Sequence, residues 1–422
     1  MMGLYRLLTK LGAPLVHRHL RSRAARGKED PARMGERLGQ ASKDRPSGDL
    51  IWLHAASVGE SASVLPLIDR LLEDPGLSVL VTSGTMTSAS MLQDRLPKRA
   101  LHQYVPVDLP DAIARFLDHW KPDLTILVES ELWPNLIGQT QERGVPMVMV
   151  QGRLSERSSR RWQRWQRMIR PLLARFRLIL AQTETDAERF RKLGASAVGV
   201  SGTLKYVTEP LPAGGADLSA FQRQVGARPI WLAASTHDGE EDAVMTAHIE
   251  ARTRLVDLLT IVVPRHPDRG NEVAAIAEKR GLTVAQRTKA EPIQQGTDIY
   301  LADTLGELGL FYRVAPLVFV GGSLVDAGGH NLIEPIQLGG AVVCGPHLAN
   351  MAEVAEDLTH ANALRTVSDG HRLGSAVGDL LRDTDARTKL VQAQSAVIRE
   401  KAGVLETVMT ALKPYLPRQR TA

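Results

Sequence analysis

The stretch Ile51–Glu60, IWLHAASVGE, followed by SASVLPLIDRLL at 61–72, predicts the fold class of this chain. Ile51, Trp52 and Leu53 are apolar and follow polar, proline-containing sequence, which is typical of a short buried strand. Small residues stand where this strand would turn into a helix: Ala55, Ala56, Ser57 and Gly59. Apolar residues then recur at helical spacing: Val64, Leu65, Leu67, Ile68, Leu71 and Leu72. The stretch therefore predicts a strand–turn–helix unit of an α/β fold.

Glu60 lies in the first turn of this predicted helix, beside small residues that let a ligand approach the backbone. One interpretation is a structural acid that interacts favourably with the unpaired N–H groups and the dipole of the helix. The other is a general base at the mouth of a cleft. The residues of this stretch alone leave both interpretations open.

The rest of the chain continues the alternation of strand and helix. A first series of β-rich runs is separated in several places by helical stretches, and the runs lie at 77–81, 124–128, 145–150, 178–181 and 197–202. The segment VTEPLPAGGAD at 207–217 breaks the pattern and predicts a linker. A second series follows at 230–235, 258–264, 298–302, 316–323 and 341–345. Such alternation predicts parallel sheets wrapped by helices.

With 422 residues the chain is too long for one core, so we predict two Rossmann-like domains. The predicted domains are 49–206 and 218–422, the second including a terminal helix, with the linker 207–217 between them. Residues 1–48 form a separate basic segment. Open α/β sheets bind ligands at the carboxyl ends of their strands, so we expect the active site in a cleft between the domains.

The composition is that of a soluble globular protein, with 43% hydrophobic and 23% charged residues. Cys344 is the single cysteine, which excludes an intramolecular disulfide and argues against a zinc site built on thiolates. No run approaches the ~18 apolar residues that a membrane-spanning helix needs.

The positive charge is concentrated at the N-terminus, where residues 1–48 hold 11 Lys and Arg against 4 Asp and Glu. Within Met1–Leu20, leucines alternate with basic residues, and no signal-peptide cleavage site follows. This pattern fits an amphipathic segment on an anionic membrane surface. It fits equally a helix docked on its own domain.

A second basic segment, Arg153–Arg177, has nine arginines and one acid. Trp162 and Trp165 continue at helical spacing into Met168, which predicts one apolar helix face and one arginine face. A basic helix beside an anionic ligand or lipid headgroup explains this arrangement, and without a nucleic-acid-binding motif we do not expect nucleic acid as a partner.

Polar side chains follow most of the predicted strands. The glycine-rich loop Gly321–Asn331 is suited to holding phosphate with backbone amides, and Arg265 adds a charge and geometry that phosphate favours. Glu334 could accept hydrogen bonds from ribose hydroxyls, or be a first-turn acid of its helix. His237, His266 and His330 would meet only if the fold brought them together, so we expect no metal site. Together these segments predict a nucleotide-sugar site in the second half of the chain, facing a general base in the first half.

The sequence resembles bacterial 3-deoxy-D-manno-octulosonic acid (Kdo) transferases of lipopolysaccharide synthesis. The matching stretches extend from the N-terminus to about residue 350 and are specific as a set: LYRLLT, GERLG, HAASVGE, ESELWPNL, GRLSERS, STHDGEE, PRHPDR, DTLGEL, FVGGSLVDAGGHNLIEP and GPH, with PYLP near the C-terminus. The resemblance implies a two-domain GT-B fold and an inverting, metal-independent transfer of Kdo from CMP-Kdo to the 6'-hydroxyl of a lipid A precursor. It places the protein at the cytoplasmic face of the inner membrane, without a cofactor.

The resemblance also implies roles for individual residues. The catalytic base falls on Glu60, and the positions that stabilise the transition state fall on Glu129 and Lys205. The implied CMP contacts are Pro264, Arg265, Leu305, Gly306, Glu307, Asn331, Leu332, Ile333 and Glu334.

The chain departs from the family pattern at 151–152, 206–207 and 348–351, which concerns the acceptor contacts and not the chemistry. Two alternatives remain. One is another GT-B nucleotide-sugar transferase or epimerase with a uridine donor. The other is a glycolipid-binding protein without catalysis.

Overall fold

The computed structural model describes residues 2–207 and 209–417, and the chain divides into two compact units. Unit 1 runs to Thr208 and resumes at Ala402, and unit 2 is Glu209–Lys401. Residue 1 of the predicted basic segment, residue 208 of the predicted linker and residues 418–422 of the predicted second domain lie outside the described residues.

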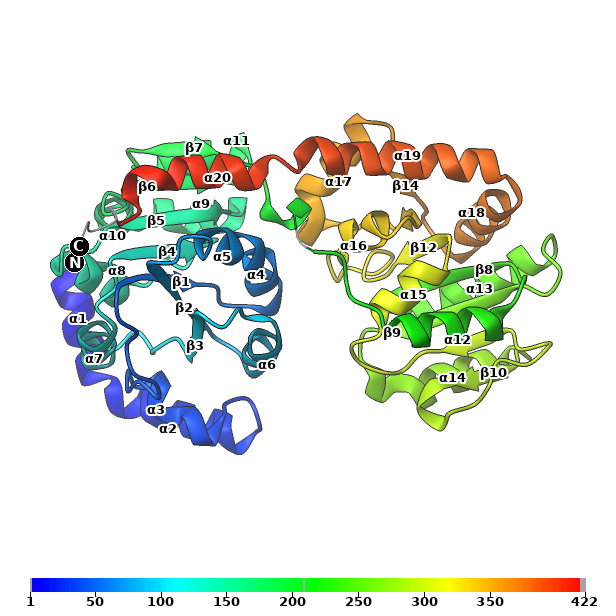
Figure 1. Cartoon of the computed structure of the whole chain (residues 1–422), viewed down its shortest axis with the longest axis horizontal. Coiled ribbons are helices and arrows are strands. Elements are labelled where there is room, and N and C mark those ends of the chain that lie inside the picture. The colour runs from blue at the N-terminus through cyan, green and yellow to red at the C-terminus, as the bar shows by residue number, and fades with distance from the viewer. Residues whose placement is uncertain (1, 208, 418–422) are drawn as a thin grey trace. The chain divides into compact units, whose positions relative to one another are not determined.

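Unit 1 is built on one parallel sheet (Figure 1). Its strands are β1 (Asp49–His54), β2 (Leu77–Ser83), β3 (Ala100–Tyr104), β4 (Leu124–Val128), β5 (Met147–Gly152), β6 (Leu178–Ala181) and β7 (Val198–Val200). Its helices are α1 (Met2–Leu11), α2 (Ala13–Ala25), α3 (Met34–Arg37), α4 (Val58–Ser63), α5 (Leu65–Leu71), α6 (Met86–Arg95), α7 (Pro110–Trp120), α8 (Pro134–Glu142), α9 (Glu156–Gln163), α10 (Gln166–Leu173), α11 (Glu184–Lys192) and α20 (Val404–Leu412).

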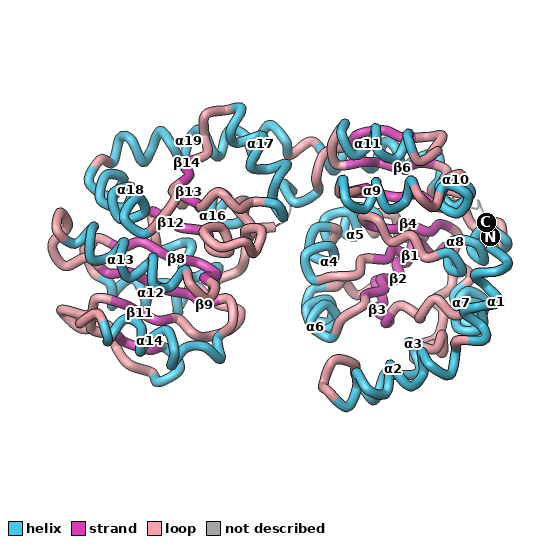
Figure 2. The backbone as a smooth tube through the Cα atoms, turned by 180° about the vertical axis from the view of Figure 1, so that it is seen from behind, coloured by secondary structure: helices cyan, strands magenta, loops and turns pink. Residues whose placement is uncertain are grey.

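Unit 2 repeats this plan, and in each unit the strands form a layer between helices (Figure 2). Its strands are β8 (Ile230–Thr236), β9 (Leu259–Pro264), β10 (Val284–Gln286), β11 (Ile299–Leu301), β12 (Leu317–Val320), β13 (Ala341–Cys344) and β14 (Arg365–Thr366). Its helices are α12 (Gly215–Val225), α13 (Glu240–Arg252), α14 (Gly270–Lys279), α15 (Leu308–Val314), α16 (Ile333–Gln337), α17 (Ala352–His360), α18 (Gly370–Arg382) and α19 (Thr384–Lys401). The predicted α/β fold class with two Rossmann-like halves is confirmed.

The strand order gives each sheet a point where the direction of winding reverses. In unit 1 the order is β3-β2-β1-β4-β5-β6-β7, so the reversal lies between β1 and β4. In unit 2 the order is β10-β11-β9-β8-β12-β13-β14, so the reversal lies between β8 and β12. The loops that leave neighbouring strands at such a point diverge and open a crevice, which is where α/β sheets bind ligands.

The core of unit 1 shows the period of two that a sheet covered on both faces requires. Leu50 and Trp52 belong to one buried cluster, whereas Ile51 and Leu53 belong to another. All four side chains are fully buried. The apolar run that predicted β1 therefore supplies both faces of the sheet.

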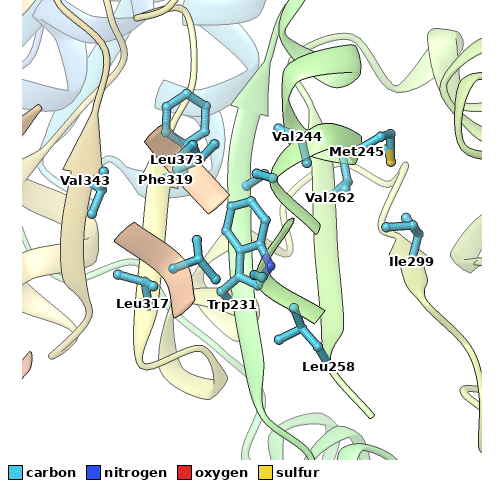
Figure 3. Packing of buried hydrophobic residues seen from close by; sticks show 14 of the residues in the cluster. Trp231, Val244, Met245, Leu258, Val262, Ile299, Leu317, Phe319, Val343 and Leu373 are labelled. Atoms are coloured by element: carbon cyan, nitrogen blue, oxygen red, sulfur yellow. The ribbon is translucent and has the colours of Figure 1, made fainter. Parts of the chain in front are cut away.

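Unit 2 has a corresponding core around Trp231 of β8 (Figure 3). Phe319 of β12 and Val262 of β9 lie in the same cluster, together with Val244 of α13. The central strands of the sheet are thereby held rigid beneath the loops that follow them.

The N-terminal segment docks on unit 1 and is not separate from it. Helix α1 packs against α7 and α8, and the Tyr5 hydroxyl donates to Asp108 at 3.0 Å. Asn135 of α8 donates to Thr9 at 3.0 Å. Five leucine side chains of this segment nevertheless remain more than half exposed: Leu4, Leu7, Leu8, Leu11 and Leu15. Among the described helices, none combines the length and the apolar character needed to cross a bilayer.

The terminal helix is placed differently from the prediction that assigned it to the second domain. Val404, Val408 and Leu412 of α20 are buried in a cluster with Leu204 of unit 1. These three residues recur every four positions and give α20 a single apolar stripe, which packs against α5 and the turn after β7. The chain thus returns to unit 1 after Lys401.

The predicted continuous helix face of the arginine-rich segment is wrong. The helix is interrupted between α9 and α10, with Trp165 at the break. Trp162 packs against the core, whereas the Trp165 side chain is 54% exposed. Because the interruption changes the helical phase, the two tryptophans do not share one buried face.

Candidate active site

Three loops of unit 1 carry the predicted catalytic residues. Glu60 lies in α4 after β1, Glu129 directly follows β4, and Lys205 lies in the short 3-10 turn after β7. The first two loops leave the sheet at its reversal point. This is the position at which a parallel sheet opens a crevice.

Glu60 closes the N-terminus of α4 in a variant of the capping box, in which its carboxylate binds the Ser57 hydroxyl and the N–H before the N-cap residue Ser57. Its backbone N–H donates to the Ser57 hydroxyl oxygen at 3.3 Å, and its carboxylate accepts from that hydroxyl at 2.7 Å. The same carboxylate accepts from the Ala56 N–H at 2.9 Å. Ser-x-x-Glu is the sequence pattern of this motif. The structural interpretation of Glu60 is therefore correct, and it leaves room for the other, because a carboxylate offers about four lone-pair sites.

Glu129 lies within the electrostatic range of both other predicted catalytic residues. Burial and the nearby Glu60 carboxylate raise the pKa of Glu129, while Lys205 and Arg153 act to lower it. Its backbone has φ of 60°, which is unusual for a residue other than glycine, and its N–H donates to Val150. The fold thus brings together Glu60, Glu129 and Lys205, which are distant in sequence.

Gln151 holds the turn that carries Lys205, a role that the sequence did not reveal. Its side-chain oxygen accepts from the Thr203 hydroxyl at 3.0 Å and from the Leu204 N–H at 2.8 Å. Its side-chain nitrogen donates to the Gly202 carbonyl at 3.0 Å. Gln151 is almost fully buried and has φ of 57°. The departure from the family pattern at this position therefore lies beside the turn that carries the predicted catalytic residue Lys205.

A second pair joins the buried His54 to the partly buried Glu131. His54, at the end of β1, places Nδ1 3.0 Å from the Thr82 carbonyl and Nε2 3.6 Å from Glu131. Burial acts to raise the pKa of Glu131, but His54 and the Trp133 N–H outweigh it, so that this pKa is lowered. The sequence reasoning missed Glu131, although it stands two residues after Glu129 in the quoted ESELWPNL stretch.

An apolar cavity of about 770 Å³ adjoins this pair within unit 1. His54, Ala56 and Glu131 line it on the sheet side, and α1 and α2 line it on the other. The Leu and Val side chains that line it are Leu8, Leu15, Val16, Val105, Val107, Leu109 and Leu136. Ala56 lines the cavity, and its N–H donates to the Glu60 carboxylate. The cavity therefore lies next to the predicted general base.

In unit 2 the glycine-rich loop does not have the form that was predicted. The Glu240 carboxylate, fully buried, accepts from the N–H groups of Gly322, Ser323 and Leu324 at 2.6, 2.9 and 2.8 Å. It also accepts from the His237 N–H at 3.0 Å. An internal carboxylate thus occupies three amides of the loop that we expected to hold phosphate. The first part of Gly321–Asn331 is a structural element.

The predicted nucleotide contacts lie on several loops of unit 2. Arg265 is exposed directly after β9, where Pro264 is buried. Glu307 is already paired with Arg287 at 2.7 Å, a hydrogen bond that lowers the pKa of Glu307. Leu305 is exposed, and Gly306 has φ of 82°.

The segment that opens α16 is largely inward-facing. The Asn331 side chain accepts from the Ile333 N–H at 2.9 Å and so caps the helix. The side chains of Leu332 and Ile333 are fully buried, so only their backbone could contact a ligand. Complete burial raises the pKa of Tyr312, and the negative charge of Glu334 raises it further.

The three histidines that the sequence left apart do meet in the structure. His237 and His330 stack with ring centroids 5.0 Å apart, and the ring of His266 lies 6.1 Å from that of His237. No set of three or more His, Cys, Asp or Glu side chains suited to a metal ion occurs within residues 2–207 and 209–417.

Comparisons with known proteins agree with this arrangement. A family model described as 3-deoxy-D-manno-octulosonic-acid transferase (kdotransferase) matches residues 32–208. The 3-deoxy-D-manno-octulosonic acid transferase of Haemophilus influenzae is 36% identical, over 92% of this chain and 92% of the relative. That of Bordetella pertussis is 35% identical, over 98% and 99%.

Solved structures give the fold. A glycosyltransferase from Rickettsia africae superposes with a TM-score of 0.60 at 14% identity, covering 89% of this chain and all of its own. UDP-GlcNAc 2-epimerase from Neisseria meningitidis gives a TM-score of 0.59 at 9% identity, covering 87% of this chain and all of its own. The fold is thus of the GT-B type, and the similarity to the two transferases extends over nearly the whole chain. This chain belongs to the family of 3-deoxy-D-manno-octulosonic acid (Kdo) transferases.

Proposed function

We propose that this protein transfers Kdo from CMP-Kdo to the 6'-hydroxyl of a lipid A precursor, with inversion and without a metal ion. The observation that carries the proposal is the cluster of Glu60 and Glu129, which follow the strands at the reversal point of the unit 1 sheet, with Lys205 from the turn after β7, in a chain of the Kdo transferase family. Unit 1 would bind the acceptor and unit 2 the donor.

The proposed chemistry assigns one task to each group. The Glu60 carboxylate takes the proton of the acceptor hydroxyl as that oxygen attacks the anomeric carbon of Kdo. Lys205 and Arg265 offset the negative charge of the sugar carboxylate and the departing phosphate. Glu129, with its raised pKa, orients Lys205 and Arg153 and does not itself accept the proton.

The direct test is a transfer assay with the full chain in detergent. CMP-Kdo is generated in situ, the acceptor is a tetraacylated lipid A precursor, and products are identified by mass. We expect the acceptor to gain the mass of one or more Kdo units. A folded protein that transfers nothing from CMP-Kdo would overturn the proposal. Turnover of a uridine donor would then indicate another GT-B enzyme, and binding without turnover a glycolipid-binding protein.

We further propose that the protein is held at the cytoplasmic face of the inner membrane by the exposed leucines of α1 and α2. Replacing Leu4, Leu7, Leu11 and Leu15 by glutamine should release the protein from vesicles that contain anionic lipid, because each exposed leucine contributes about 1.5–3 kcal/mol when it is buried. The Tyr5–Asp108 contact that docks α1 is left intact. Flotation of vesicles measures the bound fraction.

A matched control is Val256→Gln, which changes an apolar side chain that is 90% exposed in unit 2. It should leave binding unchanged. If the leucine variant stays bound but raised salt releases it, the arginines of 153–177 hold the membrane instead, since screening weakens exposed charges.

A further inference from the structure

Three imidazoles meet at the carboxyl ends of adjacent strands of unit 2. His237 follows β8, His266 follows β9 and His330 lies in the loop after β12. The Nε2 atoms of His237 and His330 are 2.7 Å apart, and the two rings lie nearly parallel, at 10°. This pair stands at the reversal point of the sheet, where the winding opens a crevice.

Gly322, in the loop around the pair, lets the two imidazole rings lie close to the backbone. Gly322 has φ of 67°, and a Cβ atom there would lie 3.2 Å from Nε2 of His330 and 3.4 Å from Cδ2 of His237. The buried Glu240 carboxylate anchors both sides, because it accepts from the N–H of His237 and from that of Gly322. The backbone of His237 is therefore tied to the glycine loop, and the His330 N–H donates to the Gly321 carbonyl of the same loop at 3.2 Å.

The pair can hold one proton between its facing nitrogens but not two. At 2.7 Å, one Nε2 must donate and the other accept, and two facing N–H groups would clash. Burial, then His237, Arg265 and His266, lower the pKa of His330 to about 4. Burial likewise lowers the pKa of His237; Glu240 acts to raise it, whereas His266, Arg265 and Arg269 lower it further. Without a ligand, the pair is uncharged near neutral pH.

A bound anion would reverse this balance. Two cations act on the pair, Arg265 and Arg269, but Arg269 is already paired with Glu241 and Glu272, each at 2.8 Å. Arg265 is therefore the cation that favours an anion here, and an anion stabilises the charged imidazole. Two of the proposed CMP contacts lie close to the pair: Asn331 directly follows His330, and the Arg265 charge acts on both His237 and His330. The phosphate of a sugar nucleotide at these contacts would lie beside the pair.

We propose that the His237–His330 pair takes up one proton when the donor binds and gives it to the departing phosphate. This inference rests on the proposed function. The bond between the anomeric carbon of Kdo and the phosphate oxygen breaks, and its electron pair remains on that oxygen. The proton that the pair took up moves from Nδ1 of one ring onto the phosphate, while the facing Nε2 atoms keep the one proton that they share. The acceptor hydroxyl supplies the new bond to Kdo and loses its own proton to Glu60. The products are the glycoside and CMP as the monoanion, and the pair returns to its uncharged form.

The kinetic test uses the full chain with His237→Gln, His330→Gln and the double variant. Glutamine places an amide near the position of Nε2 but does not titrate in this range. We expect kcat for transfer from CMP-Kdo to fall about 100-fold with KM little changed. The double variant should be no worse than either single variant, because the two residues act as one unit. His371→Gln, which alters a 78% exposed side chain, is the control and should have no effect.

The pH profile separates proton donation from positioning. A proton donor must be protonated, so wild-type kcat should fall as pH rises through the pKa of the liganded pair. The variants should lose this alkaline limb. Variants that retain the wild-type rate, or that are slow but keep the alkaline limb, would overturn the inference.

Calorimetry provides a readout that does not depend on turnover. CMP is titrated into the protein at about pH 7.5, where free CMP is mainly the dianion because its second phosphate pKa is about 6. In buffers of different ionisation enthalpy, wild type should take up a proton on binding, and the variants should not. Equal proton uptake in wild type and variants would contradict the inference. A wild type that transfers no Kdo overturns the proposed function separately, before any variant is compared.

Discussion

Replacing Glu60 by glutamine should lower the rate of Kdo transfer by about 1,000-fold, the middle of the range for a lost general base. Glutamine is nearly the same size as glutamate but cannot take a proton from the acceptor hydroxyl. The transfer assay measures the rate, and thermal unfolding measures stability. We expect the unfolding midpoint to change little, because Ser-x-x-Gln also forms a capping box.

These two readouts decide between the two interpretations of Glu60. If the residue only caps α4, the variant should transfer Kdo at close to the wild-type rate. If it is the base, the rate falls while stability and CMP binding are preserved. Glu184→Gln is a suitable control, since Glu184 is an exposed first-turn acid of α11 in the same unit. Transfer by Glu60→Gln within twofold of wild type would rule out the base.

Replacing Glu240 by alanine should have the second large effect, on stability. Four backbone N–H groups lose their acceptor: those of His237, Gly322, Ser323 and Leu324. Each buried unsatisfied donor costs about 1–3 kcal/mol, and water entering the space left by the side chain recovers part of this. We expect unit 2 to lose about 3 kcal/mol or more of unfolding free energy. Hydrogen exchange in residues 321–331 would report the loss locally.

Glu240→Gln tests whether the loop needs both carboxylate oxygens of Glu240, with little change in side-chain size. The amide retains one oxygen but turns an NH₂ group toward backbone N–H donors, so this variant should also be destabilised and should bind CMP weakly. Glu278→Gln, an exposed change in α14, is the matched control. If Glu240→Gln keeps wild-type stability and rapid exchange is absent from the loop, the carboxylate does not organise it.

Much of the fold could be predicted because side-chain periodicity is local. The central strands of both sheets are near-continuous apolar runs, as in IWL of β1 and LTILV of β4. Of the four edge strands, β7 lies within the predicted run 197–202, whereas β3, β10 and β14 were missed for the same reason. Strand β3 buries His102 and Gln103, whose side chains bond with Ser83 and Trp120, so its sequence lacks an apolar run. Strand β14 has only two residues.

The sequence predicted some residues of the candidate site but not how others hold them in place. The resemblance named Glu60, Glu129 and Lys205, and their electrostatic coupling shows that the fold brings them together. It marked Gln151 only as a departure from the family pattern and gave Glu131 no role, because the roles of both depend on residues far along the chain. The prediction of a phosphate-holding glycine loop was reasonable for a Gly-Gly-Ser segment after a strand. It did not anticipate that Glu240, 82 positions earlier, occupies those amides.

The sequence by itself determined what depends on neighbouring residues. The two α/β halves follow from the alternation of apolar runs with helical spacing, and the capping box at Glu60 joins residues three positions apart. Only the tertiary structure decided the order of the strands, and with it the reversal points at β1/β4 and β8/β12. It also decided the contact between His237 and His330, which are 93 positions apart. The physical reason is that parallel strands pair through crossovers, so their neighbours are chosen by the packing of the whole sheet and not by local pattern.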